Sequence, residues 1–348
     1  MVTTAFTAAL LRASANGFAG LAATRLIEGH TALAAPAGFE AWRLHLRTQI
    51  GALAAAVEDG APDRFASHAR WSRDALAARD MPVAALSAAN ACLRDVLRES
   101  LPEGAWARLA VYLDGAGDEI ARPQSPSVSD LPGASAHGQR ALDYVNALVA
   151  GDEQRAVALI LDALDAGQLS IKEVLAEVLV PAQRELGRLW HQGIINIADE
   201  HFGSLVTEKV LARAIARAPS RAPNGRTVVV AAVAKDAHDL GVKVVAAFFE
   251  LDGWRSICLG SNTPIEDLVQ FTVRYDANLV ALGATLETQR EMAKRTLEAL
   301  RLARPGQRVL VGGAAFAGDP ELWRRIGADG YADSADSAVD IARQLLGP

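Results

Sequence analysis

The stretch TVVVAAVAKDAHDLGVKVVAAFFELDGWRSICLG, residues 227–260, decides the fold of the last third of the chain. It opens with an apolar, β-branched run typical of a buried strand, continues as a helical pattern from Gly241 to Leu251, and returns to a strand at RSICLG. The alternation continues, with strands expected at LVALGA, RVLVGG and GYADSA and helices at 264–275, 287–303, 320–326 and 338–346. This pattern predicts a doubly wound parallel sheet, whose ligands bind beyond the carboxyl ends of the strands.

The residues before this stretch are expected to form two helical bundles. Residues 1 to about 120 are rich in alanine, and turn signals such as Pro36-Ala37-Gly38 and Pro102-Glu103-Gly104 divide them into about five helices. A second helical region, 139–218, is expected to hold four helices, with 169–190 as one long amphipathic helix.

We therefore predict an α plus α/β chain of five segments. They are a helical domain at 1–121, a Pro- and Ser-rich linker at 122–136, a four-helix bundle at 137–218, a short linker at 219–226, and the doubly wound domain at 227–348.

Composition excludes several classes of protein. The 35 Lys and Arg residues against 41 Asp and Glu residues give a formal net charge of -6, and the first lysine is Lys172, so a direct nucleic-acid partner is not expected. No apolar run suits a bilayer, and no basic residues precede the apolar N-terminal stretch as in a secretory signal. With only Cys92 and Cys258, both expected in the core, a disulfide framework is excluded. We predict a cytoplasmic protein without a membrane partner.

The loop after the first strand carries residues suited to metal chemistry. His238 lies at the carboxyl end of that strand, where a neutral imidazole could bind a transition metal, and Asp236 could fix its tautomer through the other ring nitrogen. Gly241 would let the backbone approach a bulky group. A surface histidine beside a turn-forming aspartate is the alternative interpretation.

This loop resembles the Asp-x-His-x-x-Gly signature of cobalamin-binding domains, as in methionine synthase and corrinoid-dependent mutases. The family's next two elements have counterparts in Gly283-Ala284-Thr285, separated from Gly241 by 41 residues, and in Gly312-Gly313, separated from Thr285 by 26 residues. Gly283 departs from the usual serine, which leaves one hydrogen bond to the nucleotide tail in doubt, although Thr285 offers a hydroxyl. The resemblance implies a flavodoxin-like, Rossmann-like fold and base-off cobalamin. His238 would be the lower cobalt ligand, oriented by Asp236, and Gly312-Gly313 would make room for the dimethylbenzimidazole.

The segment EVLVPAQRELGRLWHQGIINIADEHFGSLVTEKVL, residues 177–211, resembles the helical cap of cobalamin-binding proteins. Trp190, separated by nine residues from Glu200-His201, is similar to the pattern of CarH-type adenosylcobalamin photoreceptors. The resemblance implies that Trp190, Glu200 and His201 surround the adenosyl group, and that His191 replaces it as upper cobalt ligand after light. The alternative interpretations are that Trp190 belongs to the bundle core, that Glu200 is a charge in the first turn of a helix, and that His191 is solvated at a helix end.

The layout of a helical domain before a cobalamin cap resembles the photocobilins, which pair cobalamin with biliverdin. The resemblance implies a bilin site, and its candidate neighbours are suited to propionates, pyrrole nitrogens and flat rings: His30, Trp42, His45, His68, Arg70 and Trp71. Cys92 could form a thioether to a bilin, but it also suits the helical core. A purely structural or dimerising bundle is the alternative.

The hypothesis that these resemblances favour is a sensor. It would be an adenosylcobalamin-dependent photoreceptor and not an enzyme, in which photolysis of the Co–C bond changes cap packing and homo-oligomeric state for signalling to an unknown downstream protein. The main alternative is a corrinoid carrier for methyl transfer. Two further hypotheses are less well supported. A regulator that kept only the fold is disfavoured because Asp236, His238 and Gly241 are present, and a mutase is disfavoured because the sequence shows no substrate barrel.

Overall fold

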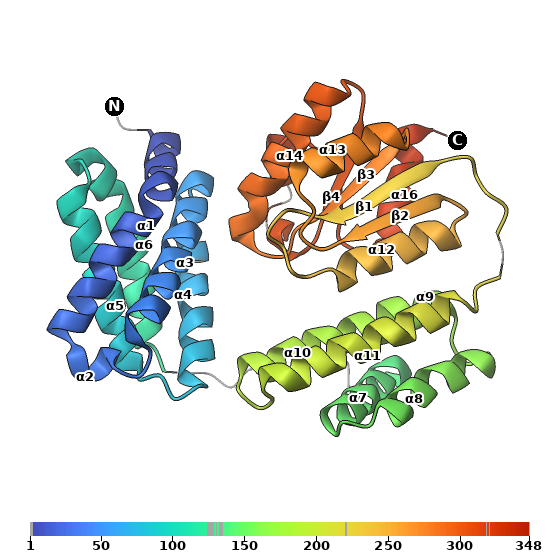
Figure 1. The fold of residues 1–348 in the computed structure, drawn as a ribbon, viewed down its shortest axis with the longest axis horizontal. Helices are drawn as coiled ribbons and strands as arrows, with labels where there is room; N and C mark the ends of the chain where they lie inside the picture. Colours follow the sequence, from blue (N-terminus) through green and yellow to red (C-terminus); the bar gives the residue numbers. More distant parts are fainter. Residues whose placement is uncertain are drawn as a thin grey trace. The chain divides into compact units, whose positions relative to one another are not determined.

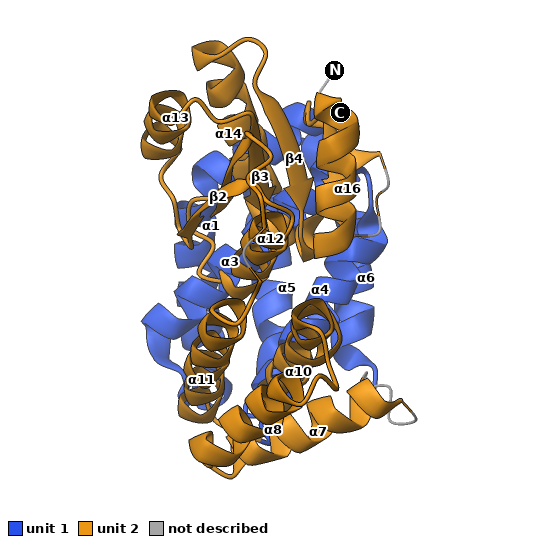
Figure 2. Ribbon diagram, turned by 90° about the vertical axis from the view of Figure 1, so that its right-hand side faces the viewer, with its two compact units in different colours: residues 1–128, 191–194 blue, residues 129–190, 195–348 orange. Residues whose placement is uncertain are grey.

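The computed structural model describes residues 3–123, 129, 131, 135–219, 221–317, 319 and 321–347. The chain divides into two compact units, one of residues 1–128 with 191–194 and one of residues 129–190 with 195–348 (Figure 2). Most of the linker predicted at 122–136 lies outside the described residues. Over the described helices, none is long and apolar enough to cross a membrane.

The first unit is helical, as predicted. Its helices are α1 (Thr4–Gly29), α2 (Thr31–Ala34), α3 (Gly38–Asp59), α4 (Pro62–Ala77), α5 (Val83–Ser100) and α6 (Glu103–Ala121). Gly60 ends α3 in the left-handed conformation, and Pro62 begins α4, where its missing N–H costs no hydrogen bond. The break at His30, between α1 and α2, directly follows Gly29 and was not predicted.

The second unit begins with a helical cap. Its helices are α7 (Ala136–Val149), α8 (Glu153–Asp165), α9 (Ile171–Glu173), the π-helix η1 (Val174–Leu179), α10 (Val180–His191) and α11 (Ile197–Ile215). Capping boxes at Ser170–Glu173 and Asn196–Asp199 begin α9 and α11. The long helix predicted at 169–190 is therefore present, but a π-helical segment interrupts its middle.

The rest of the second unit is the predicted doubly wound domain. Its strands are β1 (Thr227–Ala232), β2 (Arg255–Gly260), β3 (Leu279–Gly283), β4 (Arg308–Gly312) and β5 (Gly330–Ala332). All neighbours pair in parallel in the order β2-β1-β3-β4-β5. The connecting helices are α12 (Leu240–Leu251), α13 (Ile265–Arg274), η2 (Glu287–Gln289), α14 (Arg290–Ala303), η3 (Ala314–Phe316), α15 (Leu322–Arg325) and α16 (Ala335–Leu346). The strand order reverses between β1 and β3, which is where such sheets bind ligands.

The two faces of the sheet have separate cores (Figure 1). Val228 and Val230 point to the face covered by α12 and α16, and their cluster continues into the cap. Val229 and Ala231 point to the opposite face, covered by α13 and α14. The alternation explains why β1 is apolar from Val228 to Ala232, since both of its faces are buried there.

The prediction that Cys258 belongs to the core is wrong. Cys258 is exposed because β2 is the edge strand of the sheet and lies only partly under its helices. Cys92 is buried in the first unit, as expected.

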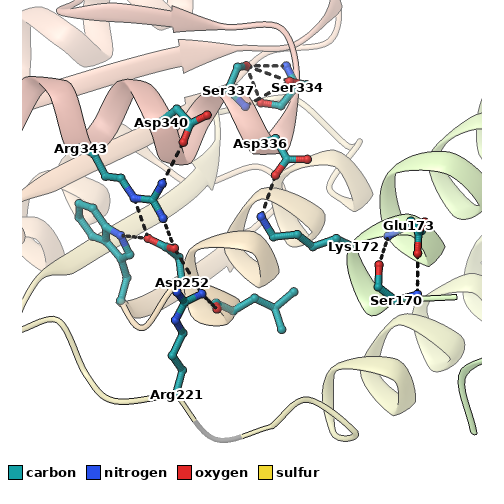
Figure 3. Close-up of polar contacts among 12 residues, drawn as sticks. Ser170, Lys172, Glu173, Arg221, Asp252, Ser334, Asp336, Ser337, Asp340 and Arg343 are labelled. Atoms are coloured by element: carbon teal, nitrogen blue, oxygen red, sulfur yellow. Dashed lines mark hydrogen bonds and ion pairs between the residues drawn. The ribbon is translucent and has the colours of Figure 1, made fainter. Parts of the chain in front are cut away.

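Ion pairs join the cap to the sheet domain within the second unit. Lys172 of α9 pairs with Asp336 of α16 (Figure 3), and the Lys172 Nζ lies 2.7 Å from Asp336 Oδ1. The Lys243 Nζ on α12 lies 2.9 Å from Glu208 Oε1 on α11. The cap and the sheet domain are thus linked by ion pairs at two separate places. Within the sheet domain, Asp252 at the end of α12 pairs with Arg343 of α16 (Figure 3).

Candidate functional site

A cavity of about 520 Å³ lies at the carboxyl ends of β1, β3 and β4, beneath the cap. Seven of the residues singled out in the sequence line it: Asp236, His238, Gly241, Gly283, Thr285, Gly312 and Gly313. The cap contributes Ala176, Glu177, Val180 and Arg184. The structure therefore gathers three sequence elements, far apart in the chain, around one space.

His238 and Asp236 form a hydrogen-bonded pair in the loop after β1. The His238 Nδ1 lies 2.9 Å from Asp236 Oδ1, and the His238 backbone N–H donates to the same oxygen at 3.0 Å. Asp236 is 1% exposed, whereas the His238 side chain is 61% exposed. Because Nδ1 is held by the carboxylate, Nε2 is the nitrogen that His238 presents to a metal.

Asp236 also joins this loop to the loop after β3. The backbone N–H of Thr285 donates to Asp236 Oδ2 at 2.8 Å. Thr285 is thus in contact with the carboxylate that orients His238, a role that the sequence analysis did not assign to it.

Two residues that the sequence analysis missed hold the same loops. Gln289 is 7% exposed, and its Oε1 accepts from the backbone N–H groups of Thr285 and Leu286, both at 2.9 Å. Asn262 Oδ1 accepts from the backbone N–H of Lys235 at 2.7 Å, and Lys235 has a φ of 68°. The Asn262 contact joins two loops far apart in the sequence, so no local pattern reveals it, whereas Gln289 caps the turn that begins three residues before it.

The electrostatics of the pair are asymmetric. The hydrogen bond to Asp236 raises the pKa of His238 above 6.5 although burial opposes it, and the charges of Asp236, Glu200 and Asp239 add to the rise. Burial by itself would raise the pKa of Asp236. Hydrogen bonds from His238 and Thr285 outweigh this effect and hold the pKa of Asp236 below its ordinary value.

The glycines at the strand ends are required by close packing. A Cβ on Gly283 would lie 2.5 Å from Val242 Cγ1, so Val242 fills the space that a serine side chain would need. A Cβ on Gly312 would lie 2.9 Å from the carbonyl oxygen of Ala332. Gly313 has a φ of 99°, and its Cβ would overlap the carbonyl oxygen of Ala284. These contacts keep the cavity floor free of side chains.

The cap residues singled out in the sequence are not among the described residues that line the cavity. Trp190 packs against the hydrophobic cluster shared by the cap and the sheet. Glu200 and His201 form a pair, with His201 Nδ1 2.8 Å from Glu200 Oε2. His191, the last residue of α10, groups with the first unit, so its role as a later cobalt ligand stays a prediction.

The structure brings together part of the candidate bilin neighbourhood in the first unit. Trp42 packs edge-on against His45, with ring centroids 5.8 Å apart, and His68 stacks on Trp71 at 6.2 Å. Burial and the neighbouring His68 lower the pKa of His45 to about 4, and burial also lowers the pKa of His68. Arg70 pairs with Glu119, and His30 is an exposed residue between α1 and α2.

The residues around the cavity fit a corrinoid. Gly283, Gly312 and Gly313 line the cavity without side chains of their own, and His238 offers one imidazole nitrogen whose tautomer is fixed by a buried carboxylate. A corrin ring would itself supply four nitrogen ligands to its metal, so one protein nitrogen would suffice.

Comparison with known proteins agrees with this site. Residues 226–340 match the B12 binding domain family, and residues 141–215 match a second B12 binding domain family. A corrinoid protein of Desulfitobacterium hafniense is 28% identical over 211 residues, covering 58% of this chain and 94% of that protein. The HTH-type transcriptional repressor CarH of Myxococcus xanthus is 31% identical over 177 residues, covering 50% of this chain and 58% of that protein.

The fold is also shared with a solved structure. The monomethylamine corrinoid protein of Methanosarcina barkeri superposes with a TM-score of 0.51 at 20% identity, covering 60% of this chain and 99% of that one. Motifs, fold and both family matches thus coincide in the second unit, and residues 141–340 constitute a cobalamin-binding module of two B12 binding domains.

Proposed function

We propose that the chain is an adenosylcobalamin-dependent light sensor that binds cobalamin base-off, with His238 as the lower ligand. The observation that supports the proposal is the arrangement of Glu200 in the cap, where its two carboxylate oxygens are held by Ser204 and by His201. A carboxylate held in this way offers hydrogen-bond acceptors, which suits an upper ligand that carries hydroxyl groups and not a methyl group.

The chain's own residues have separate tasks in this proposal. Asp236 keeps His238 in the tautomer that presents Nε2, the backbone N–H of Thr285 holds Asp236 in turn, and Gln289 fixes the loop of Thr285. Trp190 would exclude water beside the upper ligand. When bound, adenosylcobalamin supplies a Co–C bond that visible light breaks. The chain would carry out no catalytic turnover.

The output of the sensor would be a change of assembly. Both family matches lie in the second unit and leave residues 1–128 for another task. A structural or oligomerising bundle suits that task. A biliverdin site is also supported by the partly buried histidines His45 and His68 beside Trp42 and Trp71.

A second candidate function is that of a corrinoid protein carrying methyl groups between partners. It is favoured by the names of the relatives, which include a dimethylamine corrinoid protein of Methanosarcina acetivorans, 25% identical over 193 residues and covering 54% of this chain and 89% of that protein. His238 and Asp236 would do the same work in both functions.

The experiment that separates them loads the protein with adenosylcobalamin in the dark and offers it biliverdin. Spectra and size-exclusion profiles are recorded before and after green light. A light-driven change to a stable non-alkyl cobalamin spectrum with altered elution supports the sensor, and in that case His191→Ala should change the illuminated spectrum. Failure to retain adenosylcobalamin, with retention of methylcobalamin, contradicts the sensor and supports the methyl carrier.

A further inference from the structure

Lys243 of α12 contacts two carboxylates that come from different parts of the second unit. Its Nζ lies 2.9 Å from Glu208 Oε1 on α11 of the cap and 3.0 Å from Asp239 Oδ2 in the loop after β1. Asp239 directly follows His238 in the chain. One ammonium group therefore bridges the cap and the neighbour of the proposed cobalt ligand.

Asp239 stands at the N-cap position of α12, where an aspartate ordinarily accepts a hydrogen bond from the backbone of the first helical turn. Among the described residues, its side chain makes no such hydrogen bond. Its Oδ2 pairs with Lys243 instead, and it lies so near the end of β2 that a Cβ on Gly260 would be 3.4 Å away. The usual bond at the start of α12 is thus replaced by a contact that leads to α11.

The bridge is partly shielded from solvent. The side chains are 28% exposed for Lys243, 38% for Glu208 and 22% for Asp239. Burial by itself would lower the pKa of Lys243, but the hydrogen bonds and charges of the two carboxylates outweigh burial and raise that pKa. Lys243 is therefore charged at neutral pH. Without its ammonium group, the two carboxylates would repel each other.

The loop of His238 is held on both sides of that residue. Before it, the carboxylate of Asp236 accepts from the backbone N–H of Thr285. After it, Asp239 is held by Lys243, which also pairs with the cap. The first attachment lies within the sheet domain, whereas the second reaches α11.

We propose that Lys243 is a positioning residue that ties the His238 loop to the cap, by bridging Asp239 and Glu208, and so keeps the His238 imidazole placed for cobalt. The inference rests on His238 being the lower ligand, as in the proposed function, and it holds for a sensor and for a methyl carrier alike. It makes the helical cap part of the support of the lower ligand.

The test measures two quantities for the full chain in the dark: the dissociation constant of adenosylcobalamin, and the fraction of bound cob(II)alamin that carries a histidine ligand. Electron paramagnetic resonance gives this fraction, because a coordinated imidazole nitrogen splits the cobalt signal, and histidine labelled with the heavy nitrogen isotope changes the splitting. Lys243→Met should weaken binding about fivefold and lower the histidine-ligated fraction. Lys243→Arg keeps the charge and should keep both quantities near their wild-type values.

Two matched variants separate this role from simpler ones. Lys209→Met makes the same change on α11, where Lys209 forms an exposed ion pair with Glu153 inside the cap, and it should change neither quantity. Lys172→Met removes the other ion pair between cap and sheet, the one with Asp336. It should leave the histidine-ligated fraction unchanged, because this pair does not reach the His238 loop.

Glu208→Gln keeps the test decisive if Lys243→Met does not fold. This variant leaves the pair of Lys243 with Asp239 in place and weakens only the link to the cap. Glu208 is not among the described residues that line the cavity, so a direct contact with cobalamin is not expected. Glu208→Gln should nevertheless lower the histidine-ligated fraction.

The outcomes distinguish this inference from the proposed function. A wild-type protein that binds cobalamin without a histidine ligand contradicts the proposed function itself. A wild-type protein with a histidine ligand, whose Lys243→Met and Glu208→Gln variants keep the full ligated fraction, overturns the positioning role alone. An equal loss of that fraction in Lys172→Met also overturns it, because the effect would then belong to cap attachment in general.

Discussion

Asp236 shows how one buried residue can organise a site. Its two oxygens serve different loops, one accepting from His238 and the other from the backbone of Thr285. The sequence alone predicted the pairing with His238, because a carboxylate two residues before a histidine is a local pattern. The contact with Thr285 could not be predicted, since it depends on β1 and β3 being neighbours in the sheet.

Gly313 offers a prediction about backbone packing at the cavity floor. Gly313→Ala would place a Cβ against the Ala284 carbonyl at a φ of 99°, and it should destabilise the protein by at least about 2 kcal/mol. Gly306→Ala is the matched control, because a Cβ there meets no atom within 4 Å. Urea denaturation of both variants measures the effect, and equal midpoints would contradict the packing argument.

His45 makes the first unit sensitive to acid. Its pKa is about 4 in the folded chain and about 6.5 when unfolded, so the unfolded state binds the proton more readily. The stability that neutral His45 contributes is full above pH 6.5 and declines as the pH falls toward 4, by about 3 kcal/mol in total. Hydrogen exchange of α3 and α4 at pH 7 and pH 5 tests this. His45→Gln should reduce the pH dependence, and an unchanged dependence would assign the effect to other groups.

At the scale of elements, the strands were predicted most accurately. Apolar runs predicted β1 to β4 to within two residues, whereas the stretch GYADSA extends three residues beyond β5. The π-helix at Val174–Leu179 was missed, because the apolar pattern of the cap helix passes through it without interruption. Asn262 was missed because its contact with Lys235 forms only when two loops meet, and Gln289 was missed although its contacts with Thr285 and Leu286 are local.

The link between α9 and α16 should be weak on its own. The Lys172–Asp336 pair is formed by side chains that are 43% and 58% exposed, so its coupling energy should be below about 1 kcal/mol and should fall in high salt. A double-mutant cycle with Lys172→Ala and Asp336→Ala, followed by thermal unfolding, measures it. A coupling above that limit would show that the pair is a major attachment of the cap.

At the scale of the whole molecule, the cavity belongs to one unit. All of its described lining residues lie between Ala176 and Ala338, within the second unit. A chain of residues 129–348 should therefore fold and bind cobalamin with an affinity within about twofold of the full chain. Equilibrium binding by absorbance checks this, and a large loss of affinity would assign part of the site to residues 1–128.

The π-helix at Val174–Leu179 makes one part of the cap helix tolerant of a change in length. A π-helical segment typically accommodates one surplus residue inside an α-helix, so the helices on either side keep their phase. Deleting one codon from this segment would restore a regular α-helix without rotating Glu185 or Leu186 out of the core, whereas the same deletion in α11 would turn every later side chain by about 100°. Ala176 and Glu177, which line the cavity, thus lie in the part of the cap helix whose length can vary while the rest of the fold is kept.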